Sequence, residues 1–291
     1  MRIAIIGGLG FIGREFSKYA FNRGHIIDVY DMIEYEVSNE DVFNYYPIDL
    51  ASDSPSGLSK ADAMIILAAK RPYTGFSFTD YENNVRIAEK CFELAKRNNI
   101  KNLVFASSKA VYSEQKTIPW NENTYTTPLS LYGASKVAVE QLSLWHNENN
   151  ELNIKCLRVA QGIGMGERKG YLINTLIDNA MEKKQQVVFG DGSQKRQYIY
   201  IKDVCKAILT ALEHSEMKGV FNIGMPGAVS NLELAECVNK VFDNVGNLVC
   251  DLSKPMGDFC DEMDVKKAEL LLGYKTSYNI QTLFEDLAGA E

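Results

Sequence analysis

Three glycines after a short aliphatic run constrain the fold more than any other feature of the chain. Residues 3–6 (IAII) are typical of a buried strand, Gly7, Gly10 and Gly13 follow at once, and a helical pattern then runs to about residue 23. In this order the glycines allow a tight turn and let the backbone approach a pyrophosphate, whose charge the N-terminus of the helix stabilises. The pattern predicts a dinucleotide-binding strand–turn–helix unit.

A second aliphatic strand, at residues 26–30, ends in Asp31. A carboxylate at this place in such a unit binds the adenosine ribose hydroxyls. It would repel a 2′-phosphate, and residues 32–34 (MIE) include no arginine to hold one. The sequence therefore favours NAD over NADP.

Strand and helix patterns continue to alternate, with strands expected at 63–67, 103–106 and 154–158 and helices at about 79–98 and 131–147. Such alternation predicts an α/β fold with a Rossmann-type doubly wound parallel sheet, which binds ligands beyond the carboxyl ends of its strands. The residues at those ends are Gly7, Asp31, Ala68, Ser107 and Ser108.

Tyr132 and Lys136 form one of three Tyr-x-x-x-Lys pairs in the chain. The pair at 198 and 202 falls in an apolar run typical of a strand, whereas Tyr132 and Lys136 open a helical stretch and share one face of it. A nearby ammonium favours the phenolate and lowers the pKa of a tyrosine toward the range of a general base. The alternative is a surface tyrosine on an amphipathic helix.

Composition excludes several classes of protein. The chain has 291 residues, 46% of them hydrophobic and 24% charged, with a net charge of −7. It is expected to be a soluble globular protein that binds no nucleic acid, has no membrane-spanning segment and resides in the cytosol. Its six cysteines include no Cys-x-x-Cys and it has three histidines, so we expect reduced thiols and no metal site.

Together these motifs resemble the extended short-chain dehydrogenase/reductase family, in particular its NAD-dependent sugar-nucleotide epimerases and dehydratases, and most of all the UDP-hexose 4-epimerases. The resemblance extends through residues 190–204 (GDGSQKRQYIYIKDV), 221–224 (FNIG) and 264–274, nearly the whole chain. It implies that Ser108 hydrogen-bonds the substrate oxygen, that Tyr132 transfers its proton and that Lys136 binds the nicotinamide ribose. The further cofactor contacts implied by the resemblance are Phe11, Ile12, Asp49, Leu50, Ala68, Ala69, Asn84 and Ser107.

The resemblance also implies substrate contacts: Asn174 on a helix that begins at about residue 170, Val188 and Phe189 beside the base, and Arg196 near the diphosphate. Asp203 is instead expected to be only the N-cap of an apolar helix at 204–212. Two departures from the family pattern matter. Dehydratases of the family place Asp-Glu directly after the central hydroxyl residue, where this chain has Lys109 and Ala110 after Ser108, so elimination of water is disfavoured. Residues 254–258 (KPMGD) lack the arginine that usually precedes the Gly-Asp pair.

Two domains are expected. Residues 1–160 with 197–223 would form the NAD-binding Rossmann domain, and residues 161–196 with 224–291 a smaller α/β substrate-binding domain. The resemblance also implies a homodimer formed through the helices at 79–98 and 131–147.

Three functional hypotheses remain open at this stage. The first is NAD-dependent 4-epimerisation of a UDP-hexose through a 4-keto intermediate, with no net redox change. The second is an NAD(P)H-dependent reductase of a nucleotide-linked 4-keto-6-deoxy sugar, which would use the same three residues once per product. The third is a non-catalytic dinucleotide-binding protein, which the complete set of Ser108, Tyr132 and Lys136 disfavours.

Overall fold

The computed structural model contains the predicted parallel sheet. It describes residues 1–53, 58, 60–72, 75–113, 116–149, 151–168, 170–254, 256 and 259–289. Seven parallel strands lie in the order β11-β6-β5-β4-β1-β2-β3. Their bounds are β1 Arg2–Ile6, β2 Ile26–Asp31, β3 Asn44–Pro47, β4 Ala63–Ile66, β5 Asn102–Ser108, β6 Asn153–Val159 and β11 Gly219–Ile223. The Rossmann-type α/β prediction is confirmed.

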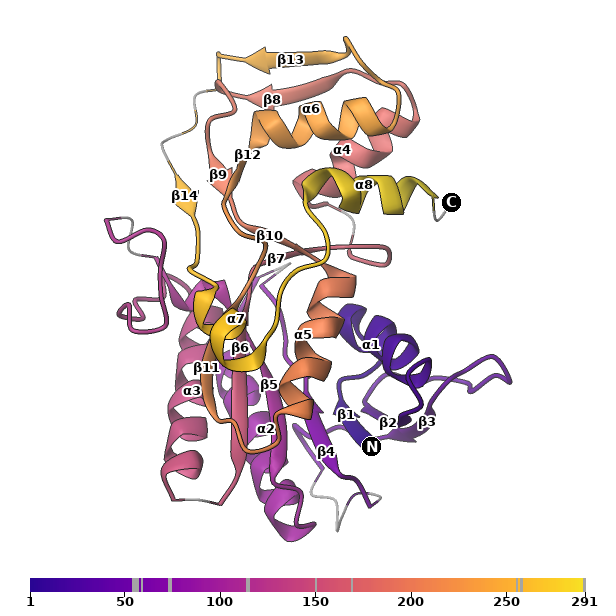
Figure 1. Cartoon of the computed structure of the whole chain (residues 1–291), viewed down its shortest axis with the longest axis vertical. Coiled ribbons are helices and arrows are strands. Elements are labelled where there is room, and N and C mark those ends of the chain that lie inside the picture. The colour runs from indigo at the N-terminus through magenta and orange to yellow at the C-terminus, as the bar shows by residue number, and fades with distance from the viewer. Residues whose placement is uncertain are drawn as a thin grey trace.

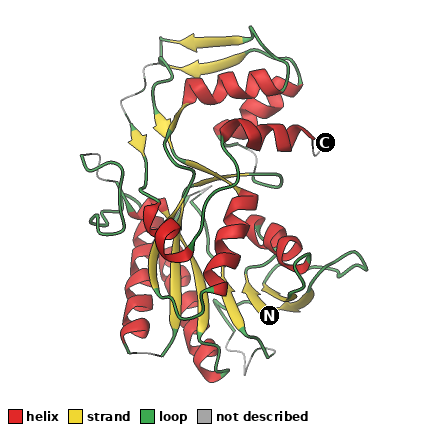
Figure 2. Ribbon diagram, in the orientation of Figure 1, coloured by secondary structure: helices red, strands yellow, loops and turns green. Residues whose placement is uncertain are grey.

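Alternate residues of the central strands pack on opposite faces of the sheet. Ile3 and Ile5 of β1 belong to the core shared with helices α1 (Phe11–Phe21) and α5 (Ile201–Glu213). Ala4 and Ile6 point into a second core, formed with α2 (Phe78–Arg97) and α3 (Leu131–Glu148). A strand covered on both faces is uniformly apolar, which is why IAII shows no polar alternation. Figure 2 shows helices on both sides of these strands.

The strand order reverses between β1 and β4, because the chain winds outward through β2 and β3 and then returns to build β4, β5 and β6 on the other side. Ligands of doubly wound sheets bind in the crevice at such a switch point. Here the two strand ends lie close together: the backbone N–H groups of Leu67 and Ala68 both donate to the carbonyl of Ile6 at 2.9 Å.

The remaining elements gather mainly beyond the carboxyl ends of the main strands (Figure 1). They are the 3₁₀ helix η1 Lys109–Val111, β7 Gln161–Ile163, α4 Leu172–Met181, β8 Gln186–Phe189, β9 Lys195–Arg196, β10 Tyr198–Tyr200, β12 Val229–Ser230, α6 Asn231–Val241, β13 Leu248–Asp251, β14 Cys260–Asp261, α7 Lys266–Leu272 and α8 Ile280–Gly289. They pair as β10-β7, β12-β9-β14 and β13-β8. Helix α5 packs on α1, and β11 joins the main sheet. The proposed domain boundaries themselves stay a prediction.

The expected role of Asp203 is wrong. Helix α5 begins at Ile201, three residues before the predicted start, so Asp203 lies inside its first turn. The buried carboxylate accepts hydrogen bonds from the backbone N–H groups of Ser277 (2.8 Å) and Tyr278 (3.1 Å). Asp203 thus ties the segment before α8 to α5.

All six cysteines are free thiols. None of the described helices is long and apolar enough to cross a membrane. Over the same part of the chain, no group of three or more His, Cys, Asp or Glu side chains could hold a metal ion.

Candidate active site

The three predicted glycines differ in what surrounds them. Gly7 has φ +82°, and an added Cβ would lie 2.5 Å from the backbone nitrogen of Ala68, so the fold itself requires this glycine. A Cβ on Gly13 would lie 2.6 Å from the Cα of Gly8. At Gly10, by contrast, an added Cβ would meet only the Gly7 carbonyl oxygen, at 3.4 Å. Packing does not require a glycine there, whereas close approach of a pyrophosphate to the backbone would.

Asp31 stands at the end of β2 and is 8% exposed. One carboxylate oxygen accepts the backbone N–H of Leu9 in the glycine turn at 2.9 Å, and the other accepts that of Ile33 at 3.2 Å. The carboxylate is therefore held beside the glycine turn. An acid fixed beside a turn with open space at Gly10 fits a dinucleotide cofactor.

Three other predicted cofactor residues make contacts within the protein. The Asp49 carboxylate accepts from the Ala51 backbone and the Ser52 hydroxyl, and the Leu50 side chain is buried in the core. The Asn84 side-chain amide bonds both the N–H (2.8 Å) and the carbonyl (3.1 Å) of Lys70. Asn84 thus fixes the segment after β4, which contains Ala68 and Ala69.

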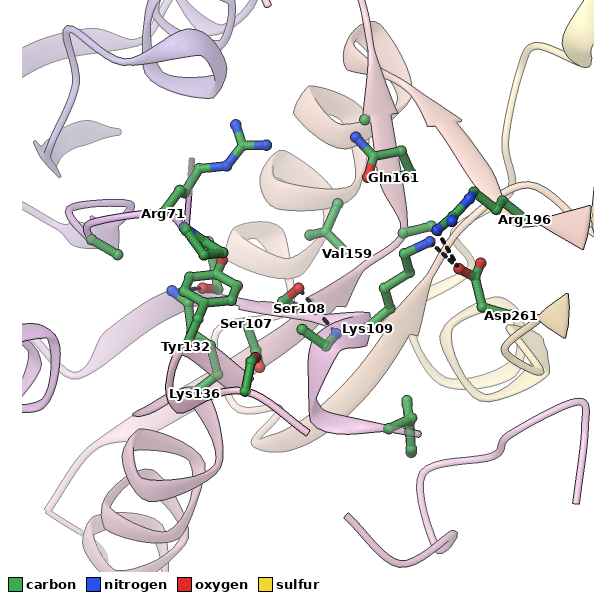
Figure 3. Close-up of a pocket in the computed structure, with 18 of the residues that line it drawn as sticks. Arg71, Ser107, Ser108, Lys109, Tyr132, Lys136, Val159, Gln161, Arg196 and Asp261 are labelled. Atoms are coloured by element: carbon green, nitrogen blue, oxygen red, sulfur yellow. Dashed lines mark hydrogen bonds and ion pairs between the residues drawn. The ribbon is translucent and has the colours of Figure 1, made fainter. Parts of the chain in front are cut away.

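A cavity of about 550 Å³ opens beyond the carboxyl ends of β4, β5 and β6. It brings together predicted residues that lie far apart in the sequence. These are Phe11, Ile12, Ala69, Ser107, Ser108, Tyr132, Lys136 and Arg196. Figure 3 shows Tyr132 and Lys136 on one side of this cavity, Ser108 at its centre and Arg196 on the opposite side.

Close packing of α3 against η1 brings Tyr132 to Ser108. Ser108 ends β5 and caps η1, its hydroxyl accepting the backbone N–H of Ala110 at 3.2 Å. Ser130 caps α3 through the N–H of Gly133 at 3.0 Å. A Cβ on Gly133 would overlap the Ala110 carbonyl, so only glycine permits this approach. Gly133 is a residue that sequence reasoning missed.

Burial raises the pKa of the Tyr132 phenol. The positive charge of Arg71 and the nearby Ser108 hydroxyl both act in the opposite direction and favour the phenolate. Tyr132 and Ser108 thus line the same cavity, and their catalytic roles stay a prediction. The expected net lowering of the phenol pKa by Lys136 is wrong for this structure, because burial dominates and Arg71 is the cation that favours the phenolate.

Lys136 lies one helical turn after Tyr132 and is 4% exposed. Its ammonium donates to the carbonyl of Ala106 at 2.8 Å and lies 5.6 Å from the centre of the Tyr132 ring. Burial lowers the pKa of this amine to about 8, although Glu140 favours its charged form. The side chain is fixed at the cavity floor by β5.

Ser107 uses its hydroxyl inside the protein. It donates to Glu140, whose carboxylate also accepts from Arg158 at 2.6 Å. Arg158 in turn donates to the Tyr112 hydroxyl, which donates to Asn222 at 3.0 Å. The Ser107 hydroxyl thus anchors a buried network behind Ser108, and the predicted cofactor contact of Ser107 stays a prediction.

Arg71 was also missed by sequence reasoning. It lies in the segment between β4 and α2 and lines the cavity next to Tyr132. Its guanidinium pairs with Glu167 at 3.1 Å and donates to the Tyr171 hydroxyl at 3.2 Å. Arg71 therefore connects the segment before α4 to the end of the sheet, next to Tyr132.

Of the predicted substrate residues, Arg196 alone joins Ser108 in the cavity lining. Asn174 on α4 donates to the carbonyl of Arg168 at 2.5 Å. Val188 on β8 packs its side chain into the core, and its predicted place beside the base stays a prediction. Phe189, on the opposite face of the same strand, is 46% exposed with the Lys254 ammonium 4.3 Å from its ring centre. In the segment 254–258, which lacks the arginine that usually precedes the Gly-Asp pair, residues 255, 257 and 258 lie outside the described residues.

Comparison with known proteins agrees with this geometry. A family model described as the NAD dependent epimerase/dehydratase family matches residues 3–224. The chain is 28% identical to a dTDP-glucose 4,6-dehydratase of Streptomyces niveus, covering 94% of this chain and 88% of that protein. It is 28% identical to a UDP-glucose 4-epimerase of Halalkalibacterium halodurans, covering 98% and 94%. The structure of a UDP-N-acetylglucosamine 4-epimerase from Bacillus cereus superposes with a TM-score of 0.89 at 30% identity, covering 100% and 96%. The family match, the switch-point cavity and the residues gathered in it lead to one conclusion: the chain belongs to the NAD dependent epimerase/dehydratase family.

Proposed function

We propose that the protein is an NAD-dependent epimerase of a nucleotide sugar, and specifically that it inverts C4 of a UDP-hexose through a 4-keto intermediate. The observation that carries the proposal is the meeting of Ser108, Tyr132 and Lys136 in one cavity at the edge of a dinucleotide fold. The UDP-sugar 4-epimerases among its relatives support the choice of reaction.

The residues that would hold the cofactor are the glycine turn at Gly7, Gly10 and Gly13, the Asp31 carboxylate and Lys136. Open space at Gly10 and the fixed orientation of Asp31 support this assignment. NAD, when bound, supplies the acceptor for a hydride from the sugar carbon.

Side chains of the protein accept and return the proton of the sugar hydroxyl. Tyr132 takes the proton of the C4 hydroxyl while Ser108 hydrogen-bonds the same oxygen, and Tyr132 returns the proton when the other epimer forms. Arg71 and Ser108 favour the phenolate that this step requires, and burial opposes it. Lys136, held by Ala106, is positioned beside the phenol ring and would bind the ribose hydroxyls of the cofactor.

Arg196 would bind the substrate diphosphate, because a planar guanidinium matches phosphate oxygens in a bidentate geometry. Phe189, exposed on β8, is a candidate contact for the base. The absence of an Asp-Glu pair after Ser108 supports epimerisation over elimination, since Lys109 and Ala110 occupy those positions.

We further propose a homodimer formed through α2 and α3. Phe78 on α2 and Leu144 and Trp145 on α3 are large apolar side chains exposed on these helices, which supports a contact there. Sedimentation of the protein and of a Trp145→Glu variant tests it.

Six free thiols support the expected cytosolic location.

Turnover of UDP-hexoses by the purified protein tests the proposed function. Protein supplied with NAD should convert UDP-glucose or UDP-N-acetylglucosamine to the C4 epimer, detected by NMR, without net accumulation of NADH. Tyr132→Phe should lower kcat by about 100-fold or more while NAD still binds. Stoichiometric consumption of NADH or NADPH with a 4-keto-6-deoxy sugar nucleotide would instead identify a reductase, and release of a 4-keto-6-deoxy product from dTDP-glucose a dehydratase.

A further inference from the structure

Asp261, on β14, is a buried carboxylate that faces the cavity across from Tyr132 (Figure 3). Three donors surround it at unequal distances. The Lys109 ammonium lies 2.5 Å from Oδ2, and the backbone N–H of Gln197 donates to Oδ1 at 2.8 Å. The nearest guanidinium nitrogen of Arg196 is 3.7 Å away.

The distance of Arg196 from Asp261 is longer than that of a hydrogen-bonded pair. A guanidinium and a carboxylate in direct contact lie at about 2.7–2.9 Å and usually share two hydrogen bonds. Among the residues that the structure describes, the Arg196 guanidinium makes no hydrogen bond, and it lies over the Phe259 ring at 4.9 Å. Its side chain is 41% exposed, against 4% for Asp261. The donors of Arg196 are thus free to bind another anion.

Lys109 explains why Arg196 does not close onto Asp261. The Lys109 side chain leaves the chain directly after Ser108, and its ammonium lies against Oδ2 of Asp261, the same oxygen that the Arg196 guanidinium faces at the longer distance. A buried carboxylate requires a neutralising partner, and without Lys109 the nearest remaining cation is Arg196. The tight partner of Asp261 is therefore a lysine brought from 152 residues away in the sequence.

We propose that Lys109 is a positioning residue that neutralises Asp261 and so keeps Arg196 available for the diphosphate of the nucleotide substrate. The inference rests on the proposed function, because it takes the anion to be a nucleoside diphosphate. Lys109 and Arg196 together exceed Asp261 by one positive charge, which suits an anionic ligand between them and the catalytic serine.

Binding of UDP tests this role without turnover. Calorimetric titration of UDP into the NAD-loaded protein should show that Lys109→Met weakens binding about tenfold or more, because Arg196 then pairs with Asp261. Asp261→Asn removes the competing charge and should bind UDP at least as tightly as the wild type. The double variant Lys109→Met/Asp261→Asn should recover the affinity of the wild type to within about threefold.

Uridine, which lacks phosphates, is the matched control ligand and should bind all four proteins equally. An unchanged UDP affinity in Lys109→Met would overturn the inference. So would a double variant as weak as Lys109→Met, since Lys109 would then contact the ligand itself or support the fold. If the wild type binds neither UDP nor dTDP, the proposed nucleotide-sugar function fails together with the inference. If it binds UDP and only the rescue fails, the proposed function stands.

Discussion

Replacement of Gly133 by alanine tests the packing that brings Tyr132 to Ser108. The added Cβ would lie 2.9 Å from the Cβ of Pro128 and 3.1 Å from the carbonyl carbon of Ala110, and closer still to the oxygen of that carbonyl. Ordinary contacts begin near 3.4 Å, so α3 and η1 must separate by at least about half an ångström, and by more at the oxygen. Since a displacement of about 1 Å in a reacting group can cost about 100-fold in rate, kcat should fall between about tenfold and 100-fold.

Whether the substitution stabilises or destabilises the protein is informative, because alanine favours a helix over glycine by about 1 kcal/mol and would stabilise α3 if the space allowed it. Gly289→Ala, in α8, makes the same change where no atom lies within 4 Å of the added Cβ, and should leave kcat unaltered. Epimer formation and thermal unfolding should be measured on both variants with NAD present. Wild-type kcat in a folded Gly133→Ala protein would refute the claim that this contact sets the position of Tyr132.

Three further predictions concern charged groups. Asp31→Ala should weaken NAD binding about tenfold or more, measured by titration, because the ribose contact and the acceptor for the Leu9 N–H are both lost; an unchanged dissociation constant would count against the ribose assignment. Arg71→Met removes the charge that favours the Tyr132 phenolate, so the rising limb of kcat/KM against pH should move to higher pH, whereas Arg71→Lys should keep it in place; no movement in Arg71→Met would contradict the role of this charge. Lys155, fully buried, has its pKa lowered by burial to about 7 from 10.5, so the unfolded chain holds more protons between these values and wild-type stability rises with pH across that window. Lys155→Met should therefore raise the free energy of unfolding by about 2–4 kcal/mol below pH 7, a figure that already subtracts the cost of losing the hydrogen bond to Asn102. Denaturant titrations should show this gain shrinking toward pH 10, and a gain independent of pH would contradict the assignment.

Periodic and local features were predictable from the sequence. The glycine turn, Asp31 at a strand end and the helix that carries Tyr132 and Lys136 lie where the patterns placed them, because each depends on residues a few positions apart. Helix α3 was expected at 131–147 and spans Leu131–Glu148.

Side-chain direction and long-range contacts were not predictable in the same way. Spacing put Lys136 next to Tyr132, but only the position of β5 reveals that its ammonium bonds the Ala106 carbonyl. Val188 and Phe189 are neighbours in sequence, and the pleat of β8 sends one into the core and the other to the surface. Arg71 and Lys109 gain their partners Glu167 and Asp261 from distant segments, so no local pattern could assign them.

The central claim is that hydrogen leaves C4 of the sugar and returns to the same carbon while Tyr132 carries the hydroxyl proton. Incubation of the NAD-loaded protein with a UDP-hexose deuterated at C4, followed by NMR of the products, tests it most directly. The account predicts the C4 epimer with deuterium retained at C4. Loss of the deuterium to solvent during epimerisation would contradict it.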